Sequence, residues 1–180
     1  PSHIDSSVLS TAECRIFELL KNDLQTKDWV VLHSLGLSNR GSKPYGEIDF
    51  VALIPREGIF CLEVKGGRIA CRNGRWETTD RHGRTEGLKR SPFIQAREGM
   101  FALRESILNR APVNFPMDLI FGYAVVMPDI TFNQQSPEWQ SWQIIDRNAM
   151  KQPMSSAILH LAAEQRKYHE ENQSRARAGS

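Results

Sequence analysis

Apolar side chains recur along the chain with two different periods, and each period predicts a type of secondary structure. A spacing of three and four residues is typical of helices, and it occurs at 10–22, 91–110 and 155–172. The first of these segments also begins with a capping box made by Ser10 and Glu13. We therefore expect three helices.

Segments rich in β-branched, aromatic and other apolar residues predict strands between and beside these helices. They lie at 29–35, 47–54, 58–65, 68–71, 75–78, 119–127 and 141–145. Polar, glycine-containing segments predict loops at 36–45 and 79–90, and Asn73-Gly74 predicts a hairpin turn. The segment 119–127 is almost wholly apolar, as in a central strand covered on both faces. The order αβββαβ therefore predicts an α/β fold, a mixed sheet flanked by helices.

A length of 180 residues suits one domain with a substantial core. We expect this core at about 10–127, a C-terminal strand and helix at 141–172, and a frayed tail at 173–180. The first residue, Pro1, is not Met, which leaves open whether the chain is part of a longer protein.

The longest apolar run is about half as long as a membrane span, so we expect no transmembrane helix. The three cysteines are scattered, which favours free thiols in a reducing cytoplasm over a disulfide framework. Neither the cysteines nor the five histidines show the spacing of a zinc site.

The net charge of +2 hides an uneven distribution of basic residues. Sixteen of the 23 basic residues are arginines, and residues 65–90 contain eight basic but only three acidic side chains. Such a segment is either a solvated loop or a patch that attracts a polyanion such as a nucleic acid. The composition is compatible with both interpretations.

Charged residues at the end of one predicted strand suggest a chemical site. Glu63 and Lys65 share a face of the strand at 58–65, and Asp49 lies on the strand before it. Aspartate is uncommon within strands, so its presence calls for a reason other than strand propensity. The alternative is an ordinary ion pair between Glu63 and Lys65. Two carboxylates and a backbone carbonyl would instead suit Mg²⁺, with the lysine assisting an attacking water.

Asp49 followed by Glu63-Val64-Lys65 resembles the PD-(D/E)xK nuclease motif, although Ile48 stands where that motif has proline. A wider set of blocks resembles the NERD, or nuclease-related, domain over about residues 10–127. These blocks are Glu13, 46–51, 58–66, 74–76 and 91–96. The resemblance implies a restriction-endonuclease-like fold.

The resemblance also implies roles for individual residues. Asp49 and Glu63, with the main chain at Val64, would hold Mg²⁺ or Mn²⁺, and Lys65 would act on the water or the transition state. Glu13 and Gln95 would be auxiliary catalytic residues. For Glu13 the capping box is an equally good explanation, and Gln95 could be an ordinary polar residue in the first turn of its helix.

These observations together predict a cytoplasmic, Mg²⁺-dependent nuclease that hydrolyses DNA. The basic residues expected to contact the DNA backbone are Arg68, Arg72, Arg75, Arg81, Arg84, Lys89 and Arg90. Trp76 lies among them and is expected to be a core residue, with base stacking as the alternative.

Two other hypotheses fit the same sequence. The chain could be a non-cleaving nucleic-acid-binding or docking domain of nuclease descent, attached to a larger helicase- or kinase-like protein. It could also be an interaction domain in which Glu63 and Lys65 only form an ion pair.

Overall fold

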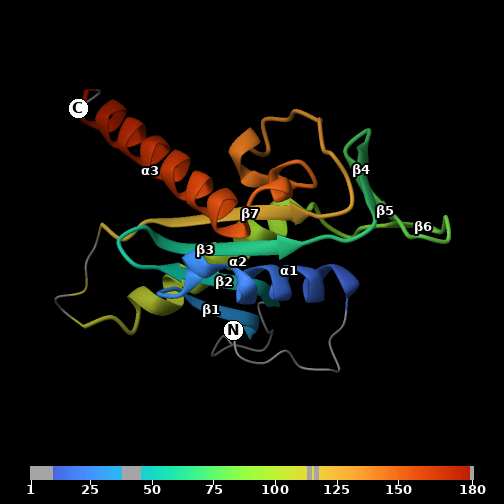
Figure 1. Ribbon diagram of the computed structural model, residues 1–180. Coiled ribbons are helices and arrows are strands. Elements are labelled where there is room, and N and C mark those ends of the chain that lie inside the picture. The colour runs from blue at the N-terminus through green and yellow to red at the C-terminus, as the bar shows by residue number, and fades with distance from the viewer. Residues whose placement is uncertain (1–9, 38–45, 113–114, 116–117, 179–180) are drawn as a thin grey trace.

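The computed structural model describes residues 10–37, 46–112, 115 and 118–178 (Figure 1). The helices are α1 (Thr11–Asn22), α2 (Pro92–Leu108) and α3 (Met154–Ala178). The strands are β1 (Val30–Gly36), β2 (Glu47–Ile54), β3 (Gly58–Val64), β4 (Arg68–Arg72), β5 (Arg75–Thr79), β6 (Thr85–Gly87), β7 (Phe121–Met127) and β8 (Ile144–Asp146). Most of the loop predicted at 36–45 lies outside the described residues.

The main sheet has five strands in the order β1-β2-β3-β7-β8. β1, β2 and β3 pair antiparallel, whereas β7 pairs parallel to β3 and β8 parallel to β7. The chain must cross over between β3 and β7 to run parallel, and α2 lies within this crossover. The predicted mixed α/β sheet flanked by helices is thus confirmed, with a restriction-endonuclease-like order of elements.

Both faces of the main sheet are covered. Residues Ile16 and Phe17 of α1 and Ile158 of α3 belong to the core on one face. Phe93 and Met100 of α2 belong to the core on the other. Because β3 and β7 lie between these two layers, they are buried along almost their whole length, as the apolar pattern predicted for 119–127.

A second, smaller sheet of β4, β5 and β6 extends beyond the end of β3 (Figure 1). It is anchored to the α2 side of the molecule by a cluster of four aromatic rings, from Trp76, Phe93, Phe132 and Trp139. Trp76 is only 5% exposed. Trp76 is therefore a core residue, as expected, and its ring is not available for stacking on a base.

Three parts of the fold differ from the sequence prediction. The predicted loop at 79–90 contains β6, because the Asp80 carboxylate accepts hydrogen bonds from the backbone of His82 and Arg84 and turns the chain back onto β5. The predicted strand at 141–145 begins as a 3₁₀ turn, Ser141–Gln143, and only then continues as β8.

The C-terminal helix is also longer than predicted. The tail expected to be frayed from 173 is helical as far as Ala178. The apolar stripe ends earlier, but the residues beyond it are mostly good helix formers such as Glu, Gln, Arg and Ala. Helix propensity therefore extends α3 past the part that the hydrophobic pattern could detect.

Candidate active site

β2 and β3 stop pairing at Asp49. Their register runs from Ile54 opposite Gly58 to Phe50 opposite Leu62 and goes no further. At the next position the Asp49 carboxylate accepts a hydrogen bond from the Val64 backbone N–H, with a distance of 2.7 Å between Oδ2 and N. A side-chain acceptor therefore replaces the strand-to-strand bond at this point.

β1 is interrupted at the same level. His33 pairs with Phe50 and Leu35 pairs with Ile48, but Ser34 between them has a φ of 53° and is not paired. This left-handed conformation is unusual for serine. Residues two apart in a regular strand share a face, yet here His33 contacts rings under α1 while Leu35 packs in the core under α2. Val31, two residues before His33, also lies in the core under α1, so the kink at Ser34 turns Leu35, and not His33, to the other face.

Glu63 and Lys65 form an ion pair at the end of β3. Lys65 Nζ lies 2.5 Å from Glu63 Oε1, and Glu63 is only 5% exposed. A buried carboxylate is costly unless it is paired, and the ammonium group provides that pairing.

Asp49, Glu63 and Glu13 affect one another electrostatically. The pKa of Asp49 is raised to about 7, mainly by burial and also by the charge of Glu63, against the opposing effects of the Val64 N–H and Lys65. Burial also raises the pKa of Glu63, while Lys65 lowers it. Glu13 raises the pKa of both. Among the residues that the structure describes, three carboxylates and one ammonium group are therefore close together, and these carboxylates outnumber the ammonium group.

Glu13 reaches this group from the first turn of α1. Its backbone N–H donates to the Ser10 side chain at 3.1 Å, so the helix cap exists. Its carboxylate, however, lies 3.2 Å from His33 Nε2, and its side chain is 13% exposed. The capping box therefore does not account for where the Glu13 side chain lies.

A close contact between α1 and the end of β3 brings Glu13 to the site. A Cβ atom added at Gly66 would lie 2.9 Å from the Cβ of Ala12, so only glycine allows this approach. The same end of α1 is tied down by Arg15, which donates to the Pro128 carbonyl at 3.3 Å. The position of Glu13 thus depends on contacts made by its neighbours along the helix.

Gln95 lies beside the site without a hydrogen bond to it. It is half-buried in the first turn of α2, one turn before Gly99. A Cβ atom at Gly99 would lie 3.0 Å from Ile48 Cγ1, so this face of α2 is turned towards β2 next to Asp49. Within the described part of the chain, the Gln95 side chain makes no hydrogen bond with Asp49, Glu63 or Lys65.

The basic residues predicted to contact DNA are all exposed, and three of them share one face of the small sheet. Arg68 pairs with Thr79, and Arg72 pairs with Arg75, opposite the face that buries Trp76. Arg72 is bound to Glu77 at 3.0 Å, whereas Arg68 and Arg75 form no ion pair with any described residue.

The remaining four basic residues lie around β6 and before α2. These are Arg81, Arg84, Lys89 and Arg90. Arg90 is held by Glu98 at 2.6 Å. The structure thus brings Arg68, Arg72 and Arg75 together and leaves the other four dispersed on neighbouring segments.

The donor atoms at the site fit a hard divalent cation. Among the described residues, no group of three or more His, Cys, Asp or Glu side chains has the geometry of a complete metal site. Asp49 and Glu63, with the main-chain carbonyl of Val64, would give an oxygen-only set, which suits Mg²⁺ because this ion retains several waters. The crowded carboxylates favour such an ion electrostatically, and Lys65 would have to leave Glu63 to admit it.

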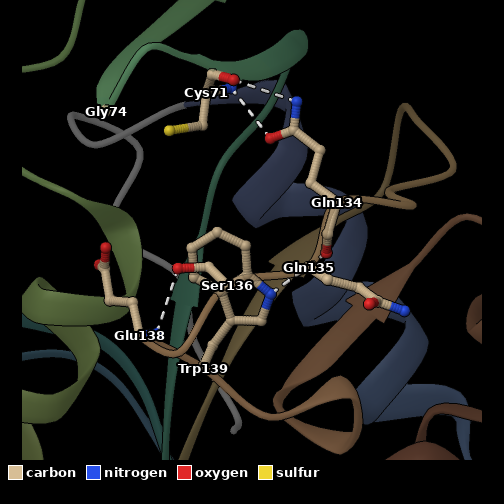
Figure 2. A pocket seen from close by; sticks show the side chains of 7 residues that line it. All are labelled: Cys71, Gly74, Gln134, Gln135, Ser136, Glu138 and Trp139. Carbon is tan, nitrogen blue, oxygen red and sulfur yellow. Dashed lines mark hydrogen bonds between the residues drawn. The ribbon is translucent and has the colours of Figure 1, made fainter.

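A separate hollow lies beside the small sheet. Its volume is about 410 Å³, and it is lined by Cys71, Gly74, Gln134, Gln135, Ser136, Glu138 and Trp139 (Figure 2). None of the predicted catalytic residues lines it. The Gln134 side chain there accepts from the Cys71 N–H at 3.2 Å and donates to the Cys71 carbonyl at 3.1 Å.

His33 and Ser34 are the residues at this site that the sequence pattern does not reveal. Both lie within the predicted strand at 29–35, and neither belongs to a motif. The alternation of side chains along a regular strand would have placed His33 and Leu35 on one face. Only the kink at Ser34 separates them, and the residue type at position 34 gives no sign of it.

The element order and the mixed sheet define an α/β protein with a restriction-endonuclease-like core. The family model of the nuclease-related domain, NERD, matches residues 10–128. The chain therefore belongs to the nuclease-related domain family, as its sequence motifs indicated. Comparison with curated proteins and comparison with solved structures each found no significant match. Across the described ranges, no helix is both long and apolar enough to cross a membrane.

Proposed function

We propose that this domain is a nuclease that hydrolyses DNA phosphodiester bonds with the help of Mg²⁺ or Mn²⁺. The observation that carries the proposal is the convergence of Asp49, Glu63 and Lys65 where β2 and β3 separate. Membership of the nuclease-related family supports a nucleic acid as the substrate.

Each residue has a distinct role in this proposal. Asp49 and Glu63, with the Val64 carbonyl, hold the ion, which supplies Lewis-acid chemistry that makes water a stronger nucleophile. Lys65, once released from Glu63, donates hydrogen bonds to the phosphate and stabilises the negative charge that develops there. Glu13 adds a third carboxylate near Asp49 and Glu63. Gln95 is an auxiliary residue on α2.

The exposed arginines of the small sheet are proposed to bind the DNA backbone. Because β4 begins only four residues after Val64, Arg68 stands next to the proposed reaction centre along the chain. Arginine forms forked hydrogen bonds with phosphate oxygens, which hold DNA without reading its sequence. The three free cysteines support a reducing, cytoplasmic environment. A helicase-like protein is the proposed setting for the domain.

A cleavage assay tests the proposal directly. Supercoiled plasmid and single-stranded DNA are incubated with the protein in Mg²⁺ or Mn²⁺, and we expect cleavage by the wild type. Lys65→Ala should reduce the rate by about 100-fold, because it removes a charge that stabilises the transition state. Lys167→Ala, on the exposed surface of α3, is the matched control and should cut normally. Wild-type cleavage by Lys65→Ala would contradict the role of this lysine.

Calorimetry tests metal binding separately from cleavage. When Mn²⁺ is titrated into the wild type, we expect a heat of binding that fits one type of site. Asp49→Asn should remove this heat because it deletes the charge of a ligand. Equal heats in the two proteins would overturn the assignment of Asp49.

The Lys65–Glu63 ion pair favours a second candidate function. It neutralises Glu63 without any ion, as in a domain that binds nucleic acid and does not cut it. Such a domain would bind DNA with an affinity that falls as salt rises, would show no Mn²⁺ heat, and would leave the plasmid intact. The two assays above therefore separate the candidates.

A further inference from the structure

We propose that His33 is a positioning residue that holds the Glu13 carboxylate in the active site. The inference rests on the proposed nuclease function. Its basis is the hydrogen bond at 3.2 Å between His33 Nε2 and Glu13 Oε2, which joins β1 to α1. The His33 side chain is 5% exposed, so this bond is shielded from water.

The imidazole ring of His33 is held by its neighbours. Its centroid lies 4.7 Å from that of Phe50 and 6.2 Å from that of Phe17, with the second pair in an edge-to-face arrangement. Phe17 is one helical turn after Glu13, so both residues that His33 contacts on α1 lie on the same side of the helix. Packing on two rings leaves the imidazole little freedom to turn away from Glu13.

Glu13 needs such a partner because its own side chain is long and flexible. Its charge raises the pKa of Asp49 and of Glu63, so its carboxylate lies close enough to affect both of them. His33 binds Oε2, and no described residue donates a hydrogen bond to Oε1.

A kink at Ser34 follows His33 directly and ends the regular alternation that places His33 and Val31 under α1. With a regular strand, His33 and Leu35 would face the same layer, whereas they face opposite layers here. The unusual backbone of Ser34, with a φ of 53°, thus stands directly after the residue that binds Glu13 and opposite Asp49. Strained backbone of this kind persists where the surrounding structure requires it.

Two substitutions separate packing from hydrogen bonding. His33→Phe keeps an aromatic ring against Phe17 and Phe50 but donates no hydrogen bond to Glu13. We expect kcat for DNA cleavage to fall about 10-fold with KM changed less than about 2-fold, as for other residues that orient an active-site group. His33→Gln carries an amide donor and should restore most of the loss. Thermal unfolding of each variant checks that it folds.

A double-mutant cycle with Glu13→Gln shows whether His33 acts through Glu13. If it does, His33→Phe should reduce kcat little or not at all once Glu13→Gln is present. If the losses of kcat in His33→Phe and Glu13→Gln multiply in the double variant, or if His33→Phe keeps the wild-type kcat, the inference is wrong while the nuclease function stands. A wild type that neither cuts DNA nor binds Mn²⁺ would overturn the proposed function, and the inference with it.

Discussion

The Asp49 carboxyl group is more basic in the folded chain than in the unfolded chain. Burial and the neighbouring Glu63 raise its pKa from 3.8 to about 7, so the native state binds a proton that the unfolded state releases at lower pH. The free energy of unfolding must therefore fall as the pH rises from about 4 to about 7, and this contribution levels off above that range. The site therefore destabilises the fold most above about pH 7, where Asp49 is ionised and would bind a cation best.

Asp49→Asn should stabilise the protein at pH 8. The amide has no charge to lose and can still accept the Val64 N–H bond, so the free energy of unfolding should increase by roughly 2–4 kcal/mol. At pH 4 the gain should vanish, because the wild-type carboxyl group is then protonated in the native state. Urea unfolding between pH 4 and 8 measures this, with Asp28→Asn on the surface as the control. A variant less stable than the wild type at pH 8 would contradict the burial of a charged Asp49.

Ser34 offers a second test at the level of one residue. Its φ of 53° disfavours any side chain, and its hydroxyl is buried without a partner among the described residues. Ser34→Gly should raise the free energy of unfolding by about 1 kcal/mol, since relief of both costs exceeds the greater flexibility of glycine in the unfolded chain.

Ser34→Ala is the comparison for this substitution. Alanine removes the hydroxyl but keeps the Cβ atom, so it should gain less than glycine. Guanidinium unfolding of both variants measures the difference. A loss of stability in Ser34→Gly would show that the kink is not strained.

Some residues of the site could be predicted from the sequence and others could not. Asp49, Glu63 and Lys65 follow from the alternation of two adjacent strands, which is a local property of the sequence. The role of His33 depends on how α1 lies over β1, because Glu13 is twenty residues away along the chain. Such contacts come from tertiary packing, and no period in the sequence encodes them.

Among the elements, the small sheet of β4, β5 and β6 carries the clearest prediction. Arg68→Gln with Arg75→Gln removes two exposed arginines that have no ion pair among the described residues. DNA affinity should fall about 10-fold at 0.1 M salt, and the slope of log affinity against log salt should decrease by about 2. Cleavage at saturating DNA should keep its wild-type kcat.

The control for this double variant is Lys167→Gln with Arg175→Gln. Both residues are exposed on α3, which points away from the small sheet (Figure 1). Fluorescence anisotropy at several salt concentrations measures the slopes. An equal loss in both double variants would mean that only total charge matters and that the small sheet is not the DNA-binding surface.

The helices and strands were predicted best where the apolar side chains recur regularly over a long segment. α1, α2 and the central strands carry such periods, and their bounds in the structure differ from the prediction by only a few residues. β6 has three residues, too few for a period, and depends on the turn that Asp80 caps. The end of α3 has no apolar stripe, so helix propensity alone extends it.

At the scale of the whole molecule, a bound ion should stabilise the fold. Mn²⁺ at ten times its dissociation constant adds about 1.4 kcal/mol to the free energy of unfolding if it binds the native state only. Differential scanning calorimetry should show a higher Tm for the wild type in Mn²⁺ than in a chelator. Asp49→Asn should show no difference between the two conditions, and an equal rise in both proteins would place the ion elsewhere.

The Gln134 side chain covers part of an exposed sheet edge, where copies of this molecule could otherwise pair. β4 is an edge strand of the small sheet, and an unpaired edge invites another chain to add a strand and begin aggregation. The Gln134 amide forms hydrogen bonds with both backbone groups of Cys71, the next-to-last residue of that edge, as Figure 2 shows. One glutamine from a distant loop thus occupies backbone groups with which a strand of another chain would have to pair along β4.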